Sequence, residues 1–273
     1  MSTGNPRELR KTVNQQKKNL LTIPFLGIAH RGASAYAPEN TMAAFDLAFR
    51  MGADMIELDV QFSSDHVPMV FHDSVLDIHT DGKGAFSDFT AKQLQKLDAG
   101  KWFSFKFEGE RIPTLSQVLE WSVDKFPVNI EIKSNRLGEK VNRSHLEAVA
   151  KLISSHQVES QVILSSFNYE WIEDFKQSMP GVLTGLLFNR HHTERGGPMH
   201  LLDRFGADLF HCSSHEMKSS WINELNEAGR KFMIYTVNRR KGVLKWLKKG
   251  THGIFSDKPD LLVESAEAFF ERN

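Results

Sequence analysis

Residues 25–73 begin FLGIAHRGASAYAPENT and end MIELDVQFSSDHVPMVFHD, so that charged residues interrupt three apolar, strand-like runs. In the middle run Glu57 and Asp59 lie two residues apart. In a strand their side chains project to one face, while their apolar neighbours project to the other. Two carboxylates held side by side repel each other unless a cation or a proton separates them. We therefore predict a metal ion at this pair.

The connection between the second and third runs is too short for a parallel crossover. Only residues 63–66 separate a strand expected at 55–60 from one expected at 67–71. A crossover between parallel strands needs a dozen or more residues. We therefore predict an antiparallel hairpin, which would return His72 to the two carboxylates.

Strand-like runs recur along the whole chain, and helical patterns separate most of them. The expected strands are 25–29, 55–60, 67–71, 128–132, 162–166, 183–188, 208–211, 232–237 and 253–255. The expected helices are 41–50, 115–121, 145–154, 169–178, 221–228 and 242–249, with Asn40, Thr114, Ser144, Asn168 and Ser220 as caps of the first five. Strands that alternate with helices indicate βα units and a parallel sheet. With the hairpin strand 67–71 set aside, eight strands remain, the number that a closed (β/α)8 TIM-type barrel requires.

An open, doubly wound sheet is the alternative fold, but no glycine-rich dinucleotide motif follows the first strand. Residues 74–112 depart most from the strand–helix alternation. They contain the Gly-rich turn TDGKG, a short helix capped by Thr90 and the aromatic run KWFSFKFEG. We interpret them as a small insertion subdomain over the barrel mouth, within a single domain that spans residues 25–273.

The composition excludes several classes of protein. The 273 residues include 34 Lys and Arg against 34 Asp and Glu, which argues against a nucleic-acid binder that works by bulk charge attraction. Cys212 is the only cysteine, so no intramolecular disulfide can form. No run of about 18 apolar residues is present, so no transmembrane segment is expected.

Residues 1–24 form a polar, basic N-terminal arm that lacks the apolar core of a secretory signal. The arm is either a lead-in to the first strand or a segment that touches anionic lipid or a partner. A cytoplasmic enzyme is the expectation.

Polar residues gather where the expected strands end, which is where barrel enzymes place their active sites. Glu131 and Lys133 end the strand VNIEIK at the same two-residue spacing. Glu57, Asp59 and Glu131 could hold one hard divalent cation, Mg²⁺ or Ca²⁺, whereas Zn²⁺ more often recruits His or Cys. Each carboxylate could instead be an ordinary rim charge, and Lys133 offers Glu131 an obvious partner.

Two histidines and two cations complete the candidate site. His30 and His72 on opposite sides of a metal would serve as general base and general acid. Arg31 and Lys133 could clamp an anionic group such as a phosphate. This set describes phosphoryl transfer better than acyl transfer, and no G-x-S-x-G nucleophile motif is present.

An ordered set of motifs resembles the glycerophosphodiester phosphodiesterase family. The motifs are HRGASAYAPENT, IELDVQFSSDHVPMVFHD, IPTLSQVLEW, VNIEIK, YTVN and GIFSDKPD, and the match covers residues 25–261. The resemblance implies a (β/α)8 barrel with an insertion. It implies metal-dependent hydrolysis of small glycerophosphodiesters, such as glycerophosphocholine and glycerophosphoethanolamine, to glycerol 3-phosphate and an alcohol.

The resemblance also implies roles for individual residues. It places the metal ligands at Glu57, Asp59 and Glu131, the acid–base pair at His30 and His72, and the phosphate-binding cations at Arg31 and Lys133. It sets Glu39 and Asn40 beside the site, although Asn40 reads equally well as a helix cap. Tyr235 stands where the family usually has Trp and would form a substrate wall with Phe167. His79 stands where the family often has Arg.

Three functions remain open on the sequence alone. The first is a glycerophosphodiesterase, and the second is a lysophospholipase D-type enzyme that removes the head group of lysophospholipids. The second would need an apolar groove, for which Phe103, Phe105 and Phe107 are candidates. The third is a non-catalytic barrel that binds phosphodiesters.

Overall fold

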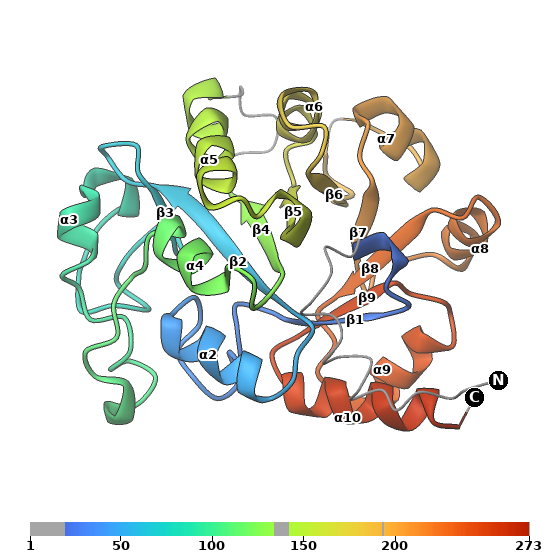
Figure 1. Cartoon of the computed structure of the whole chain (residues 1–273), viewed down its shortest axis with the longest axis horizontal. Helices are drawn as coiled ribbons and strands as arrows, with labels where there is room; N and C mark the ends of the chain where they lie inside the picture. The colour runs from blue at the N-terminus through green and yellow to red at the C-terminus, as the bar shows by residue number, and fades with distance from the viewer. Residues whose placement is uncertain (1–19, 134–141, 193, 273) are drawn as a thin grey trace.

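Eight parallel strands form a closed barrel surrounded by helices (Figure 1). The computed structural model describes residues 20–133, 142–192 and 194–272, so residues 1–19 of the predicted arm lie outside the described chain. The strand order is β1-β9-β8-β7-β6-β5-β4-β2, and β1 also pairs with β2, which closes the barrel. The predicted (β/α)8 barrel is confirmed, and the alternative of an open sheet is wrong.

Strands and helices alternate around the barrel. The strands are β1 (Leu26–Ala29), β2 (Met55–Phe62), β3 (Pro68–Val70), β4 (Val128–Ile132), β5 (Val162–Ser166), β6 (Leu183–Leu187), β7 (Leu209–Ser213), β8 (Lys231–Tyr235) and β9 (Gly253–Ser256). The helices are α2 (Met42–Arg50), α3 (Ala91–Leu94), α4 (Leu115–Ser122), α5 (Arg143–His156), α6 (Tyr169–Ser178), α7 (Pro198–Phe205), α8 (Ser219–Glu227), α9 (Arg240–Leu247) and α10 (Pro259–Phe270). Four short 3-10 helices are η1 (Leu20–Thr22), η2 (Phe86–Asp88), η3 (Phe105–Phe107) and η4 (Glu159–Gln161).

The predicted hairpin is confirmed. Strands β2 and β3 pair antiparallel, with Val60 opposite Val70. The turn between them closes on the Ser63 carbonyl, which accepts a hydrogen bond from the backbone N–H of His66. His72 follows directly after this returning strand.

Three predicted helix caps are wrong. Thr41, not Asn40, caps α2, and its side chain accepts a hydrogen bond from the Ala44 N–H. Helix α5 is preceded by Asn142 and α8 by Lys218, because both helices begin earlier than their apolar residues suggest. Helices α7 and α10 were not predicted, although each begins with a proline, a residue favoured in the first helical turn.

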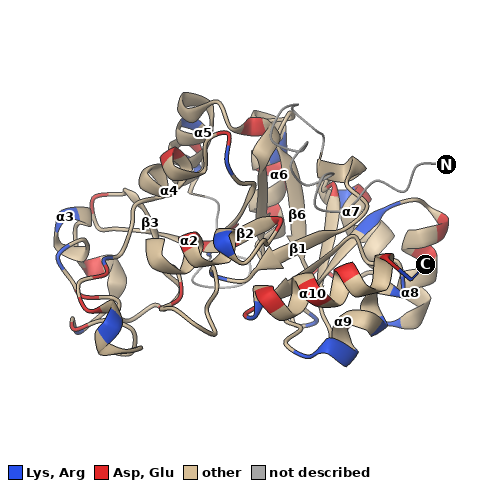
Figure 2. Cartoon of the chain, turned by 60° about the horizontal axis from the view of Figure 1, so that its bottom comes forward, with Lys and Arg blue, Asp and Glu red and all other residues tan. Residues whose placement is uncertain are grey.

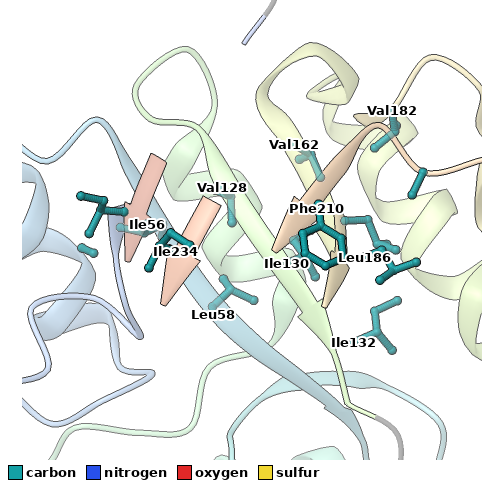
Figure 3. Close-up of a cluster of buried hydrophobic side chains, with 14 of the residues drawn as sticks. Ile56, Leu58, Val128, Ile130, Ile132, Val162, Val182, Leu186, Phe210 and Ile234 are labelled. Atoms are coloured by element: carbon teal, nitrogen blue, oxygen red, sulfur yellow. The ribbon is translucent and has the colours of Figure 1, made fainter. Parts of the chain in front are cut away.

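Apolar side chains on the two faces of the barrel strands belong to two different clusters. Ile56, Leu58 and Ile130 face outward into the layer between strands and helices, part of which is drawn in Figure 3. Met55 joins a smaller cluster that fills the barrel interior. This inner cluster includes Leu20, whose carbonyl lies 3.2 Å from Nε2 of His252, so the packed chain begins before the first strand.

Residues 74–112 lie beside β3 and α4 and pack around an apolar cluster of their own (Figure 1). Phe86 and Leu94 are buried there, and Phe71 stacks on Phe86 with ring centroids 5.3 Å apart. The three phenylalanines proposed as a groove do not alternate along a strand, because Phe105 begins the 3-10 helix η3. The separation of this segment as a subdomain stays a prediction.

Basic and acidic residues are both spread along the chain (Figure 2), as expected from their equal numbers. Basic residues gather on α9 and acidic ones on the neighbouring α10. Among the described helices, none combines the length and the apolar character needed to cross a membrane.

Candidate active site

Three acidic side chains from β2 and β4 converge inside the barrel. Glu57 and Asp59 share the inner face of β2, and Asp59 pairs in register with Glu131 of the neighbouring β4. One carboxylate oxygen from each of the three lies within 4.8 Å of the others. Hard divalent cations prefer clustered oxygen ligands of this kind, so these residues could hold such an ion.

The electrostatics of the cluster favour an added cation. Burial, and then the charge of Asp59, raise the pKa of Glu57 to about 8. Burial also raises the pKa of Glu131, in spite of the opposing charge of Lys133. A bound cation would remove the unfavourable energy of ionising these carboxyls together, so the residues present fit a metal ion.

Asp59 is the carboxylate that two basic side chains keep ionised. Its oxygens lie 3.1 Å from Nε of Arg31 and 3.5 Å from Nζ of Lys133. Burial alone would raise the pKa of Asp59, but these two cations lower it to about 2. Lys133 also donates a hydrogen bond to Glu131 over 3.1 Å. Arg31 and Lys133 therefore both contact the acidic cluster.

The HRG motif forms a tight loop that places Arg31. The backbone N–H of Arg31 donates to Oε2 of Glu57 over 2.9 Å, and the Arg31 side chain donates to Glu39 over 2.9 Å. Gly32 has φ +81°, and a Cβ there would lie 2.7 Å from the backbone carbonyl carbon of Ala44. Only glycine fits such a position without a shift of α2.

Asn40 is a site residue and not a helix cap. It adopts φ 57°, a left-handed conformation that Asn tolerates better than most residues. Its Nδ2 donates to Asp59 over 2.9 Å, and its Oδ1 accepts from the Asp59 N–H over 3.2 Å. The two hydrogen bonds therefore hold both the carboxylate and the backbone of Asp59.

His30 is oriented by a carboxylate that directly follows β9, the last strand of the barrel. Its Nδ1 lies 2.7 Å from Oδ1 of Asp257. The same Oδ1 accepts a hydrogen bond from the Ser34 hydroxyl, and Oδ2 of Asp257 accepts one from Nδ2 of Asn238. Burial lowers the pKa of His30, but the bond to Asp257 and the charge of Glu57 outweigh it, so the pKa is raised. This bond at Nδ1 leaves Nε2 free for a substrate.

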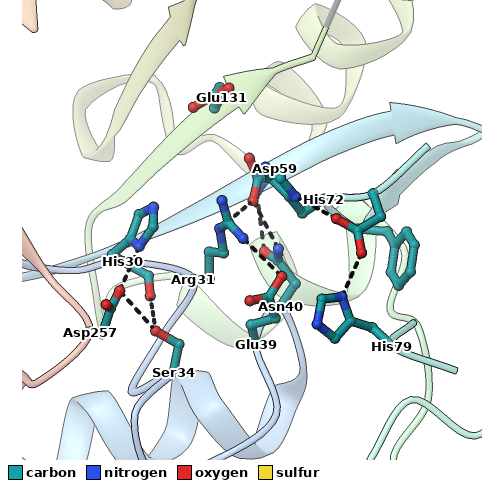
Figure 4. A network of polar contacts seen from close by, with 12 residues as sticks. His30, Arg31, Ser34, Glu39, Asn40, Asp59, His72, His79, Glu131 and Asp257 are labelled. Carbon is teal, nitrogen blue, oxygen red and sulfur yellow. Dashed lines mark hydrogen bonds and ion pairs between the residues drawn. The ribbon is translucent and has the colours of Figure 1, made fainter. Parts of the chain in front are cut away.

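His72 has a similar arrangement. Its Nδ1 lies 2.8 Å from Oδ1 of Asp73, whose Oδ2 lies 2.6 Å from Nδ1 of His79. Bonds from both histidines hold the pKa of Asp73 below its usual value, although burial opposes them. Figure 4 shows His30 and His72 on either side of Arg31 and Asp59.

One cavity of about 220 Å³ lies beside this group of residues. His30, His72 and the charged residues form one part of its lining, and Phe167 with Tyr235 forms an aromatic wall. The two rings meet edge to face with centroids 6.3 Å apart. The full lining is His30, Arg31, Glu57, His72, Asn129, Glu131, Lys133, Ser165, Phe167, Leu187, Tyr235, Thr236 and Phe255.

The structure brings the nine predicted site residues together, with Asp59 directly behind the cavity lining. Sequence reasoning gave no role to Asp257 or Asp73 and did not single out Asn129 or Ser165. Asp257 directly follows β9 and Asp73 directly follows His72, so their positions in the sequence could have indicated a role at the site. Nothing local marks Asn129 or Ser165.

The sequence relationships agree with this geometry. Residues 30–261 match the Glycerophosphoryl diester phosphodiesterase family. The chain belongs to this family. A glycerophosphodiester phosphodiesterase of Caldanaerobacter subterraneus is 41% identical over 239 residues, covering 87% of this chain and 96% of the relative. Another, of Bacillus subtilis, is 31% identical and covers 90% of this chain and 88% of the relative.

A solved structure of the family shares the fold of this barrel. It is an Oleispira antarctica phosphodiesterase in complex with the product sn-glycerol-3-phosphate, with a TM-score of 0.84 and 28% identity. The alignment covers 92% of this chain and 100% of that structure. These three relatives align with the chain over 88% or more of their own length.

Proposed function

We propose that this protein hydrolyses small glycerophosphodiesters, such as glycerophosphocholine and glycerophosphoethanolamine, to sn-glycerol 3-phosphate and an alcohol. The observation that carries the proposal is the pair of carboxylate-bound histidines beside the acidic triad and its two cations. Family membership and a relative solved with sn-glycerol-3-phosphate support the same reaction.

His30 and His72 are the proposed acid–base pair. In each, Nδ1 faces an aspartate, so Nε2 accepts a proton in the neutral ring and donates one in the protonated ring. One histidine would take the proton of the attacking hydroxyl, and the other would protonate the leaving alcohol.

Arg31 and Lys133 would bind the phosphate oxygens. Both are positively charged and line the cavity, so they stabilise the negative charge of the transition state. Glu57, Asp59 and Glu131 would hold one divalent ion, Mg²⁺ or Ca²⁺. When bound, such an ion supplies Lewis-acid stabilisation of the phosphoryl group and of the attacking oxygen.

Two routes use these residues, give the same final products and differ in one intermediate. If the glycerol hydroxyl nearest the phosphorus attacks, a cyclic glycerol phosphate forms and is then opened by water. If water attacks directly, no cyclic compound forms. Phosphorus NMR of a reaction quenched early distinguishes the two routes.

The cavity lining does not support the lysophospholipase D alternative. Phe103, Phe105 and Phe107 are absent from it. The non-catalytic alternative is also without support, because both histidines and the three carboxylates are present at the cavity.

The decisive experiment measures release of glycerol 3-phosphate from glycerophosphocholine, with and without a chelator, and with lysophosphatidylcholine as competitor. We expect release that the chelator abolishes and that added Mg²⁺ or Ca²⁺ restores. Absence of release under every metal condition would contradict the proposal.

The variants His30→Ala and His72→Ala test the acid–base roles. Each should lower turnover by about 10²–10⁴-fold while the protein stays folded, since this is the usual contribution of a general acid or base. His66→Ala, which removes a histidine outside the cavity, is the matched control. Retention of more than about a tenth of the activity by either variant would contradict its role.

A further inference from the structure

The floor of the active-site cavity carries a buried polar pair that the proposed chemistry does not use. Asn129 lies on β4 two residues before Glu131, and Ser165 lies on the neighbouring β5. Both line the cavity, and both are nearly inaccessible, with 1% and 0% of their surface exposed. Nδ2 of Asn129 donates a hydrogen bond to Oγ of Ser165 over 2.9 Å.

This pair has unused hydrogen-bonding capacity. Oδ1 of Asn129 is buried and has no hydrogen-bond partner within the described part of the chain. The Ser165 hydroxyl accepts the bond from Asn129 and still carries a proton that it can donate. Buried polar atoms are rarely left without a partner, so an unpaired acceptor that lines a cavity is available to a polar ligand. An acceptor beside a donor matches an alcohol hydroxyl, which both donates and accepts.

The depth of Asn129 fits the glycerol half of the substrate. Two residues along a strand span about 6–7 Å, so Asn129 lies roughly that far below Glu131, where the phosphate end would be held. Further down β5, Ile163 is fully buried in the apolar cluster inside the barrel, which closes the floor. The Asn129 and Ser165 side chains are uncharged, so they offer no negative charge to a cationic head group. A neutral hydroxyl needs no such charge.

We propose that Asn129 and Ser165 bind the terminal hydroxyl of the glycerol unit and so select substrates in which that hydroxyl is free. The inference rests on the proposed function. Because the floor is closed, an acyl chain esterified to this hydroxyl would have no room. The pair therefore discriminates against lysophospholipids.

The test compares glycerophosphocholine with 2-hydroxypropyl phosphocholine. This analogue keeps the hydroxyl on the carbon adjacent to the one that bears the phosphate, but it has a methyl group in place of the terminal CH2OH. The wild-type enzyme should favour glycerophosphocholine in kcat/KM by about 10- to 100-fold, because the analogue leaves buried polar groups without a hydrogen-bond partner. Asn129→Leu, which keeps the number and branching of the side-chain heavy atoms but removes the polar groups, should lower kcat/KM for glycerophosphocholine by a similar factor. It should leave the analogue within about threefold of its wild-type value, so that the preference disappears.

Ser165→Ala is the milder second variant, should Asn129→Leu fail to fold, and it should reduce the same preference. Ser166→Ala is the matched control: Ser166 is equally buried on β5, but its hydroxyl donates to the Ile132 carbonyl, and it does not line the cavity. It should keep the wild-type preference.

Two results would overturn the inference while the proposed function stands. One is a wild-type enzyme that hydrolyses both substrates equally well. The other is an equal loss for both substrates in the variants, which would indicate a purely structural role. If the wild-type enzyme hydrolyses neither substrate in the presence of Mg²⁺ or Ca²⁺, the proposed function fails and this inference fails with it.

Discussion

At the residue scale, the site contains two histidines with similar hydrogen-bonding surroundings. Each presents Nδ1 to a carboxylate, but the partners come from different places: Asp73 is adjacent to His72, whereas Asp257 lies 227 residues from His30. A carboxylate at Nδ1 fixes the ring orientation and stabilises the protonated ring. The pair is therefore held in place before a substrate arrives.

Asp257→Asn tests the positioning of His30. The hydrogen bond to Asp257 raises the pKa of His30, so its loss should lower that pKa and move the corresponding limb of the pH–rate profile to lower pH. Turnover should fall by roughly 10- to 100-fold, part of the usual acid–base contribution. The measurement is kcat and kcat/KM across pH.

The control for this experiment is Asp260→Asn. Asp260 lies three residues further on and accepts a bond from the exposed Tyr36 hydroxyl, so the charge change is the same without a contact to His30. A purely structural role for Asp257 would lower activity at every pH without a shift of the profile.

Glu57→Gln tests the acidic triad by stability instead of activity. Burial and Asp59 disfavour ionisation of Glu57, so a bound divalent cation should stabilise the folded wild-type protein. At a metal concentration of 100 times Kd the gain is about 2.7 kcal/mol, which is readily seen as a rise in Tm. The variant should need much more Mg²⁺ or Ca²⁺ for the same rise.

An equal metal-induced rise in Tm for the wild-type protein and Glu57→Gln would rule out Glu57 as a ligand. Glu110→Gln is a suitable control. Its carboxylate lies 3.4 Å from the Ala43 N–H and is not among the three clustered carboxylates.

At the element scale, adjacent residues at the start of α2 serve two different purposes. Thr41 ends the loop by capping the helix, and its hydroxyl donates to the Pro38 carbonyl over 2.6 Å. Asn40, in the left-handed conformation, turns its side chain toward Asp59. One residue therefore stabilises the element, while its neighbour organises the site.

Thr41→Ala and Asn40→Gly should separate these purposes. Loss of the cap should lower the free energy of unfolding by about 1–2 kcal/mol, with activity at saturating metal retained. Asn40→Gly keeps the backbone conformation but removes both bonds to Asp59, so it should weaken metal affinity and activity more than stability. Urea unfolding and metal-titrated assays of both variants give the comparison, and identical effects in the two would contradict it.

At the scale of the whole molecule, a buried histidine should make stability depend on pH. Burial lowers the pKa of His211, inside the barrel on β7, to about 3 from an ordinary value of 6.5. Between pH 6.5 and 3 the unfolded chain binds a proton at this position that the folded chain does not. Stability should therefore fall as the pH drops through this window, by up to about 1.4 kcal/mol for each pH unit from this group.

His211→Leu removes this proton uptake. The variant should lose less stability than the wild-type protein between pH 6.5 and pH 4.5, as measured by urea unfolding. His215→Leu, which removes an exposed histidine near the end of the same strand, is the control. An unchanged pH dependence in His211→Leu would contradict the prediction.

Much of the architecture followed from patterns that are local in sequence. The strand at 128–132 and the helix at 169–178 have the predicted bounds, because each is fixed by its own apolar spacing and, for the helix, by the Asn168 cap. The predicted first residue of a helix was wrong where the first turn carries few apolar residues, as in α5 and α8. Helices α7 and α10 were missed although each begins with a proline.

The sequence by itself determined the barrel, the hairpin and the shared face of Glu57 and Asp59, because side-chain alternation and connection length act within one or two elements. Only the tertiary structure decided that Asp257 supports His30, that Asn40 holds Asp59, and that Asn129 and Ser165 form the cavity floor. Barrel closure pairs β1 with β9, and the β4–β5 register sets Ser165 opposite Glu131. Contacts between different strands depend on barrel closure and on register, which the spacing of residues within one segment does not reveal.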